Sequence, residues 1–328
     1  MGTGEPAAAT KRVLAARPDP PVEIPPSWEV LVERGVSTGV CMEADPLMVS
    51  AGRPDRAVTD RILDIADEAG YRPALADAAA GTVTAWPRFA WTVRSAARGL
   101  GRRGLVEADT AGVFVDDAAS AAIAVNAIRA AGATACLIRH DAGPADIAAQ
   151  LNACGARLLI TSAPLAELAA EGADRSRVRQ IISFGEAVGT TPFGWLVETG
   201  LHGADLDSAD LHGADLDSAD LHAAAAEPGV LGESGRPEGN GLADHHGIVD
   251  GRGDELTGRD VVVATPPCGD GHAYLSLLDF TLLTGAMLVA APLPLVTDAM
   301  RVYRGTAAIV PRDTVVPGLP LDRIFPVA

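Results

Sequence analysis

The chain has 328 residues, of which 48% are hydrophobic and 4% aromatic, and its formal net charge is −17 at pH 7. This length allows one large domain or two modest ones. An acidic surface repels nucleic acid and anionic membranes, so we expect neither as a partner. The amino terminus has no charged start before an apolar run, and the apolar stretch 275–294 is interrupted by Asp279, Gly285 and Pro292. We therefore expect a cytoplasmic protein without a signal peptide or a membrane span.

The first hundred residues begin with a segment of biased composition and continue with helix and strand patterns. Residues 1–26 are rich in Pro, Ala and Gly, which is typical of a disordered tail. The patterns that follow predict two capped helices, a hairpin and an amphipathic helix, at residues 28–34, 61–69, 73–84 and 89–100. We expect the arginines on and just after the last helix to face water: Arg94, Arg98, Arg102 and Arg103.

Strand-like and helix-like patterns alternate without interruption over residues 110–185. The predicted strands and helices follow one another at residues 110–115, 118–131, 133–138, 144–153, 158–161, 163–171 and 180–184. Asp116 and Asp117 are candidate caps for the first of these helices, and Gly132 and Gly155 would end two of them. This alternation predicts an α/β fold, with parallel-sheet layers and flanking helices.

The remainder of the chain contains an acidic repeat, a glycine-rich stretch and a second α/β pattern. The decapeptide at 201–210 is repeated without change at 211–220. Strand and helix patterns return at residues 260–264, 275–284, 286–290 and 307–310, before a Pro-containing tail. We therefore expect four regions: a disordered tail at 1–26, an α/β subdomain at 27–200, an acidic linker at 201–258 and a second, incomplete α/β segment at 259–328.

The four cysteines are scattered through the chain without the C-x-x-C spacing of metal or redox sites: Cys41, Cys136, Cys154 and Cys268. Cys136 and Cys154 lie in apolar strand and helix patterns. We interpret these two as buried free thiols rather than as disulfide partners or metal ligands.

Several stretches resemble the adenylate-forming family of acyl-CoA synthetases, whose relatives include 4-coumarate ligase and the adenylation domains of peptide synthetases. These stretches are residues 67–75, 82–84, 97–105, 127–133 and 155–162. They are similar to an opening hairpin, the helix after it, and a further helix and strand of the family's large domain. The resemblance extends over residues 63–310 and implies the front part of that domain.

The resemblance implies a loop rich in Ser, Thr and Gly that ends in Pro-Lys-Gly and binds the ATP phosphates. The corresponding stretch is residues 232–239, where Glu238 occupies the lysine position. A carboxylate repels a triphosphate that an ammonium group would attract. We interpret its last six residues as a vestigial phosphate loop: Ser234, Gly235, Arg236, Pro237, Glu238 and Gly239.

Lys11 is the only lysine in the chain, so the loop lysine and the catalytic lysine of the family's small carboxyl-terminal domain are both missing. The family's adenine contacts, magnesium-binding glutamate and ribose-binding aspartate would fall beyond Val310. We therefore expect a truncated, non-catalytic relative without a cofactor or metal, acting as a binding or regulatory module through another protein or self-association. The alternative is an AMP-forming acid–CoA ligase that uses ATP and Mg²⁺ and is completed in trans by a second chain.

A second enzymatic alternative is an acyltransferase, because residues 245–251 fit an HHxxxDG pattern that contains His246 and Asp250. In that chemistry His246 would be the general base, but such a base needs a structured tunnel, which the sequence around it does not indicate. Five neighbouring side chains could bind a divalent ion: Asp244, His245, His246, Asp250 and Asp254. Ligands packed this closely on a glycine-rich loop are typical of an adventitious site.

The decapeptide repeat also divides into four Ala-Asp-Leu-x-x pentapeptides, which begin at Ala204, Ala209, Ala214 and Ala219. Pentapeptides of this kind wind into a β-helix when many coils stack, whereas four of them would make about one coil. We interpret the repeat as a duplication within an acidic linker.

Overall fold

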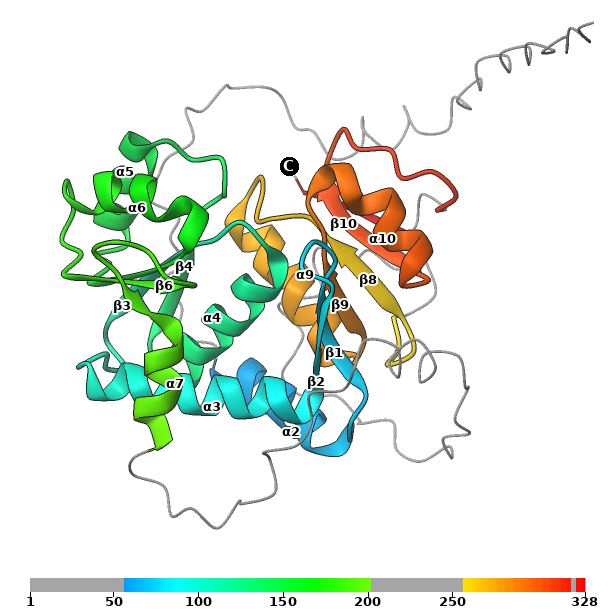
Figure 1. Cartoon of the computed structure of the whole chain (residues 1–328), viewed down its shortest axis with the longest axis horizontal. Coiled ribbons are helices and arrows are strands. Elements are labelled where there is room, and N and C mark those ends of the chain that lie inside the picture. Colours follow the sequence, from blue (N-terminus) through cyan, green and yellow to red (C-terminus); the bar gives the residue numbers. More distant parts are fainter. Residues whose placement is uncertain (1–55, 202–255, 320–322, 328) are drawn as a thin grey trace, which may run out of the picture. The chain divides into compact units, whose positions relative to one another are not determined.

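The structure, a computed structural model, describes residues 56–201, 256–319 and 323–327. These residues belong to the larger of the chain's two compact units, Pro46–Ala328. They form two β-sheets with helices on both faces of each (Figure 1). The α/β class with parallel-sheet layers and flanking helices, predicted from the sequence, is therefore confirmed. None of the described helices is both long and apolar enough to cross a membrane.

The five-stranded sheet is built from the alternating stretch of the sequence. Its strands are β3 (Thr110–Phe114), β4 (Thr134–Leu137), β5 (Leu158–Ser162), β6 (Gln180–Phe184) and β7 (Thr191–Pro192). They pair in the order β4-β3-β5-β6-β7, and each neighbouring pair is parallel. The central strands are buried almost throughout, as expected of a parallel sheet that is covered on both faces.

The helices of this half divide between the two faces of the sheet. They are α4 (Ala118–Ala130), α5 (Pro144–Ala153), α6 (Ala166–Ala173) and α7 (Phe193–Leu201), with a short 3-10 helix, η1 (Ala163–Leu165), before α6. α4 packs with Val113 in one apolar cluster, whereas α5 and α6 pack with Phe114 in another. Because Val113 and Phe114 are consecutive on β3, they point to opposite faces. α4 therefore covers the inner face, and α5 and α6 cover the outer one.

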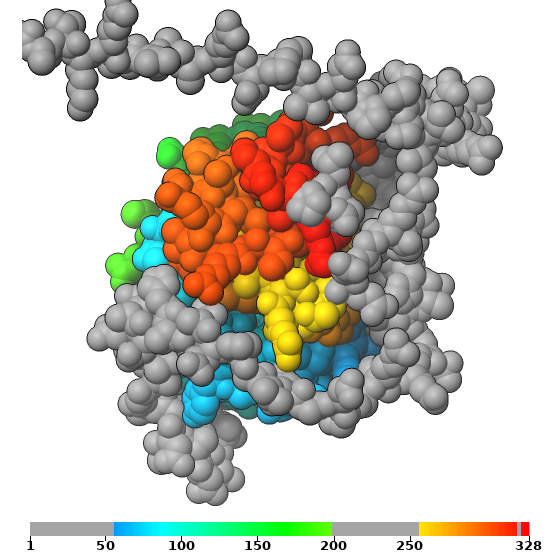
Figure 2. All heavy atoms as spheres, turned by 90° about the vertical axis from the view of Figure 1, so that its right-hand side faces the viewer, coloured from blue at the N-terminus to red at the C-terminus, as the bar shows by residue number. Residues whose placement is uncertain are grey.

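The six-stranded sheet combines the hairpin with the carboxyl-terminal elements. Its strands are β1 (Pro73–Asp77), β2 (Thr82–Ala85), β8 (Val261–Ala264), β9 (Met287–Ala290), β10 (Ala307–Pro311) and β11 (Ile324–Val327). The order is β11-β10-β8-β9-β1-β2, and only β1 and β2 are antiparallel. α9 (Gly271–Leu283) covers the inner face, and η3 (Leu293–Leu295) and α10 (Val296–Val302) lie on the outer face, where α10 is orange in Figure 2.

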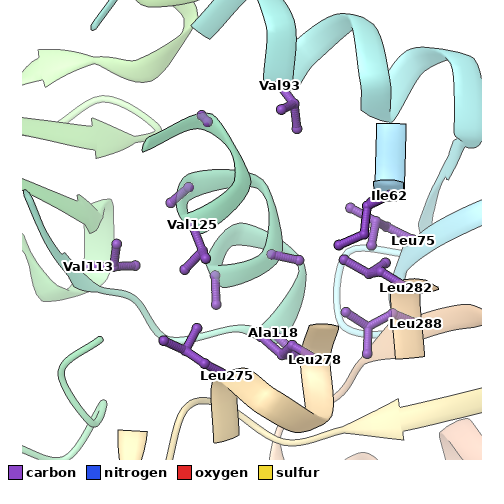
Figure 3. Packing of buried hydrophobic residues seen from close by; sticks show 14 of the residues in the cluster. Ile62, Leu75, Val93, Val113, Ala118, Val125, Leu275, Leu278, Leu282 and Leu288 are labelled. Carbon is purple, nitrogen blue, oxygen red and sulfur yellow. The ribbon is translucent and has the colours of Figure 1, made fainter. Parts of the chain in front are cut away.

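The two sheets share one inner layer of helices, formed by α4 and α9 together with α2 (Arg56–Glu68) and α3 (Trp86–Arg102). Val113 of the five-stranded sheet and Leu288 of the six-stranded sheet belong to the same buried cluster. Figure 3 shows Val125 of α4 and Leu275 of α9 pointing into this layer. The main apolar core therefore lies between the sheets and belongs to both.

Both sheets repeat one topology. In each, a strand is followed by an inner helix and a neighbouring strand (β3-α4-β4 and β8-α9-β9), and an outer helix then carries the chain back across the first strand to β5 or β10. Both inner helices end before a glycine of positive φ, Gly132 at 88° and Gly285 at 71°. Glycine adopts this conformation without the steric cost that a side chain adds.

The structure differs from the sequence-based expectations at several places. The predicted boundary between regions 27–200 and 259–328 does not separate the sheets, because β1 pairs with β9. Two helices begin earlier than expected, at Arg56 and Trp86. Arg94 does not simply face water, since it donates two hydrogen bonds to Asp67, at 3.0 and 2.7 Å. The predicted Pro-containing tail contains strand β11, and Cys136 and Cys154 are free but half-buried rather than buried.

Candidate functional site

The carboxyl ends of the parallel strands are the places where an open α/β sheet offers a binding crevice. In each sheet this crevice lies between two neighbouring strands whose following chain segments leave toward opposite faces. In the five-stranded sheet these strands are β3 and β5, and in the six-stranded sheet they are β8 and β10. The residues that directly follow these four strands therefore border the two crevices.

The β3–β5 edge is acidic and closed by hydrogen bonds. The backbone N–H of Asp116 donates to Ser162 Oγ at 3.3 Å. The Asp117 carboxylate caps α4 by accepting a hydrogen bond from the Ser120 N–H at 2.6 Å. Burial raises the pKa of Asp117, the Ser120 hydrogen bonds oppose this, and the nearby charges of Asp116 and Asp77 raise it further. Asp116 and Asp117 thus lie at this edge, and Asp77, at the end of β1 in the other sheet, is close enough for its charge to influence Asp117.

The β8–β10 edge is organised by a buried tyrosine. Tyr274 of α9 is fully buried, and its hydroxyl donates a short hydrogen bond to the Thr265 carbonyl. The Thr265 N–H donates in turn to the Ile309 carbonyl at 3.0 Å, and its hydroxyl lies 3.8 Å from Cys268 Sγ. Burial raises the pKa of Tyr274 well above its usual range, with smaller contributions from Cys268 and Asp117. Burial also raises the pKa of the Cys268 thiol.

The two edges meet through the loops that follow β4 and β8. The His140 N–H donates to the Pro267 carbonyl at 2.9 Å, and the protonated Nδ1 of His140 donates to the same oxygen at 2.8 Å. A side chain at Gly271 would place its Cβ 2.8 Å from the Leu137 carbonyl oxygen, so glycine is required for this close approach. The charge of Asp117 makes a small contribution to raising the pKa of Tyr274, in keeping with the proximity of the two edges.

This arrangement favours neutral or cationic ligands over anionic ones. Asp116 and Asp117 follow β3, and Asp77 is the last residue of β1. The hydroxyl of Tyr274 and the imidazole of His140 are both engaged with backbone carbonyls. No group of three or more His, Cys, Asp or Glu side chains with metal-binding geometry occurs among the described residues. The ends of β1 and β3 are therefore acidic, which disfavours an anionic ligand there.

The site residues predicted from the sequence lie outside the described residues. This holds for the vestigial phosphate loop, Ser234 to Gly239, for the acyltransferase alternative, His246 and Asp250, and for the pentapeptides that begin at Ala204. The described chain resumes at Leu256, which is buried, five residues before β8 begins. The predicted loop precedes β8 in the sequence, with residues 240–260 between them, and Thr265 directly follows that strand.

A shallow cavity of about 350 Å³ lies apart from these edges, between the β1–β2 turn and α10. Ala78, Gly81 and Tyr303 line it, and the charge of Asp298 is partly satisfied by Arg301 at 3.1 Å. Burial raises the pKa of Tyr303. No arginine or lysine is among the residues that line this cavity, so its lining does not suit a phosphate ligand.

The sequence predicted Asp117 as a helix cap but not the proximity of its charge to Tyr274, nor the contacts of Tyr274 with Thr265 and of His140 with Pro267. The position of Thr265 directly after a predicted strand is the one signal in the sequence that points to this edge, and Tyr274 contacts the carbonyl of Thr265. The contact between His140 and Pro267 joins residues 127 positions apart, and no local pattern encodes it.

Comparison with known proteins agrees with this fold. Residues 64–201 match the family model of the AMP-binding enzyme, and residues 195–224 match that of pentapeptide repeats. No curated protein matches the sequence. A long-chain-fatty-acid–CoA ligase from Archaeoglobus fulgidus is 16% identical with a TM-score of 0.56, over 78% of this chain and 51% of that one.

Two further solved structures are similar. A putative long-chain-fatty-acid CoA ligase from Rhodopseudomonas palustris is 15% identical with a TM-score of 0.56, over 79% of this chain and 63% of that one. The amide bond synthetase McbA from Marinactinospora thermotolerans is 17% identical with a TM-score of 0.53, over 82% of this chain and 53% of that one. The chain thus spans between about half and two thirds of the length of these structures. Its described part has the fold of the large domain of adenylate-forming enzymes.

Proposed function

We propose that this chain is a cytoplasmic binding or regulatory module that keeps the fold of an adenylate-forming enzyme but does not activate acids with ATP. The observation that carries the proposal is the charge of the phosphate loop. Glu238 occupies the position at which the family's loop has lysine, and Lys11 is the chain's only lysine. A site needs its own residues and not only its fold.

The repulsion between a glutamate at position 238 and the ATP phosphates is large compared with typical differences in binding free energy. Two like charges about 4 Å apart at an effective dielectric of about 20 repel each other by about 4 kcal/mol. Asp77, Asp116 and Asp117 add negative charge at the strand ends. Both contributions oppose a triphosphate, so the charge of the described edge supports the same proposal as Glu238.

The partner of such a module is proposed to be another protein or a second copy of the chain. The segment after β6 supports this idea, because Val188 is fully exposed and Trp195 on α7 is 57% exposed. Exposed large apolar side chains are enriched at surfaces that contact other proteins.

Calorimetry of the full chain with ATP and Mg²⁺ tests the proposal, with Glu238→Lys and, as a control with the same change of charge, Glu227→Lys. We expect no heat of binding from the natural protein. Binding by the natural protein would overturn the proposal and support the ligase completed in trans. Binding by Glu238→Lys but not by Glu227→Lys would show that the loop differs from a working one mainly in its charge. Light scattering on the same sample tests self-association, against which a mass of 33.6 kDa would count.

A further inference from the structure

Cys136 and Cys154 come together on the outer face of the five-stranded sheet, away from the edges described above. Cys136 lies on the edge strand β4, opposite Gly112 of β3, and Cys154 is the C-cap residue of α5. Cys136 and Ile138 are two residues apart and so share a face. Ile138 belongs to the outer apolar cluster, against which Cys154 packs. Strand and helix thus present both thiols to the same side.

The absence of a side chain at Gly112, which pairs with Cys136, explains why the end of α5 packs so closely on the sheet. A Cβ atom at Gly112 would lie 2.6 Å from Leu151 Cδ2 and 3.7 Å from Ile138 Cδ1. The missing side chain allows Leu151 of α5 to pack directly against the sheet. Cys154 lies one turn after Leu151, with its Sγ 3.6 Å from the Leu151 carbonyl oxygen, and this packing brings its thiol to Cys136.

The two thiols influence each other on this face of the sheet. The interaction with Cys136 lowers the pKa of Cys154 against the opposing effect of burial, whereas the interaction with Cys154, together with burial, raises the pKa of Cys136. Cys154 is therefore the group of the pair that ionises first. Both residues are half-buried, whereas Cys268 is buried, so a small reagent reaches the pair more readily.

We propose that Cys136 and Cys154 are a reversible disulfide site, oxidised by a small disulfide such as oxidised glutathione. The Cys154 thiolate attacks one sulfur of the oxidant, which forms a mixed disulfide and releases one glutathione thiolate. The Cys136 sulfur, after losing its proton, then attacks Cys154 Sγ and releases the second glutathione thiolate. The two protons lost by the cysteines are taken up by the two glutathione thiolates, so two thiols and one disulfide give one disulfide and two thiols.

The consequence of this bond would be a covalent link between β4 and α5. β4 is an edge strand held by one neighbour, β3, and it leads into the loop whose His140 contacts Pro267. A link that closes the short segment from Cys136 to Cys154 restricts the unfolded chain and holds the edge strand against its helix. Oxidation would therefore stabilise the strand that supports one side of the candidate site.

Peptide mapping of the full chain tests the proposal directly. Because the chain has no lysine near these residues, trypsin cuts after Arg129, Arg139 and Arg157 and places the two cysteines in separate peptides, 130–139 and 140–157. After incubation with oxidised glutathione and blocking of free thiols, we expect these two peptides to be joined, with a mass two hydrogens below their sum. Reduction before digestion should separate them.

Variants and an unfolded sample complete the test. Cys268→Ser should give the same linked peptides, whereas Cys154→Ser should give none. Oxidation in concentrated urea should distribute the linkages among all four cysteines, including Cys41. The proposal would be overturned if the natural protein yielded only glutathione adducts. It would also be overturned if links through Cys41 or Cys268 formed to the same extent in the folded as in the unfolded state. Both results come from the natural protein and do not depend on the folding of any variant.

Discussion

The ion pair of Arg129 and Asp279 is the residue contact that most directly joins the two halves of the fold. Arg129 lies on α4 and Asp279 on α9, and one guanidinium nitrogen lies 2.7 and 2.9 Å from the two carboxylate oxygens. The side chains are only 10% and 13% exposed. Removing one partner leaves a nearly buried charge, so we expect Arg129→Met to lower the free energy of unfolding by about 3–5 kcal/mol, measured by urea denaturation.

Two comparisons separate this explanation from a loss of packing. The double variant Arg129→Met with Asp279→Leu should recover much of the stability, because it leaves no charge behind. The exposed pair of Arg301 and Asp298, whose side chains are 80% and 65% exposed, serves as the control. Arg301→Met should cost less than about 1 kcal/mol. Equal losses from Arg129→Met and Arg301→Met would show that burial of the pair contributes nothing.

Single residues were only partly predictable from the sequence. Asp117 was identified as a helix cap because Asp before an alanine-rich helical pattern is a local signal, and it caps α4 as predicted. The pairing of Arg129 with Asp279 spans 150 positions. Nothing in the neighbourhood of either residue indicates its partner, because the contact depends on how α4 and α9 pack between the sheets.

The crossing of α3 and α7 is a close helix contact that depends on a glycine. A Cβ atom at Gly99 would lie 2.3 Å from the Leu196 carbonyl oxygen, and 2.8 and 2.9 Å from two other backbone atoms of Leu196. Backbone atoms cannot move aside as a flexible side chain can, so Gly99→Ala should force the helices apart. We expect a loss of about 1–3 kcal/mol in the free energy of unfolding.

Gly101 on the same helix provides a matched control for that substitution. A Cβ atom there would meet nothing within 4 Å, and alanine favours a helix over glycine by up to about 1 kcal/mol. Gly101→Ala should therefore leave the protein equally or slightly more stable. If both variants lost the same amount in thermal or urea unfolding, the cost would come from the helix itself and not from the contact with α7.

At the scale of elements, local patterns predicted the helices and strands well, and their assembly poorly. α5 and β6 have the predicted bounds, and the hairpin of β1 and β2 is present. The other neighbour of β1, however, is β9, which begins at Met287, far later in the chain. β11 was missed because Pro326 suggested a tail, although an edge strand tolerates proline. Periodicity describes which face of an element is buried, but not what covers it.

For the whole molecule, the shared inner layer predicts that the two sheets unfold together. Val113 and Ile160 of one sheet and Val262 and Leu288 of the other belong to a single buried cluster, so neither sheet can open without exposing α4 and α9 to water. Hydrogen exchange followed by mass spectrometry at increasing urea measures this. We expect peptides from β3 and β8 to lose protection at the same urea concentration, and Arg129→Met to lower both midpoints equally. Protection that persists in one sheet after the other has opened would instead mean that each sheet is stabilised mainly by its own outer helices.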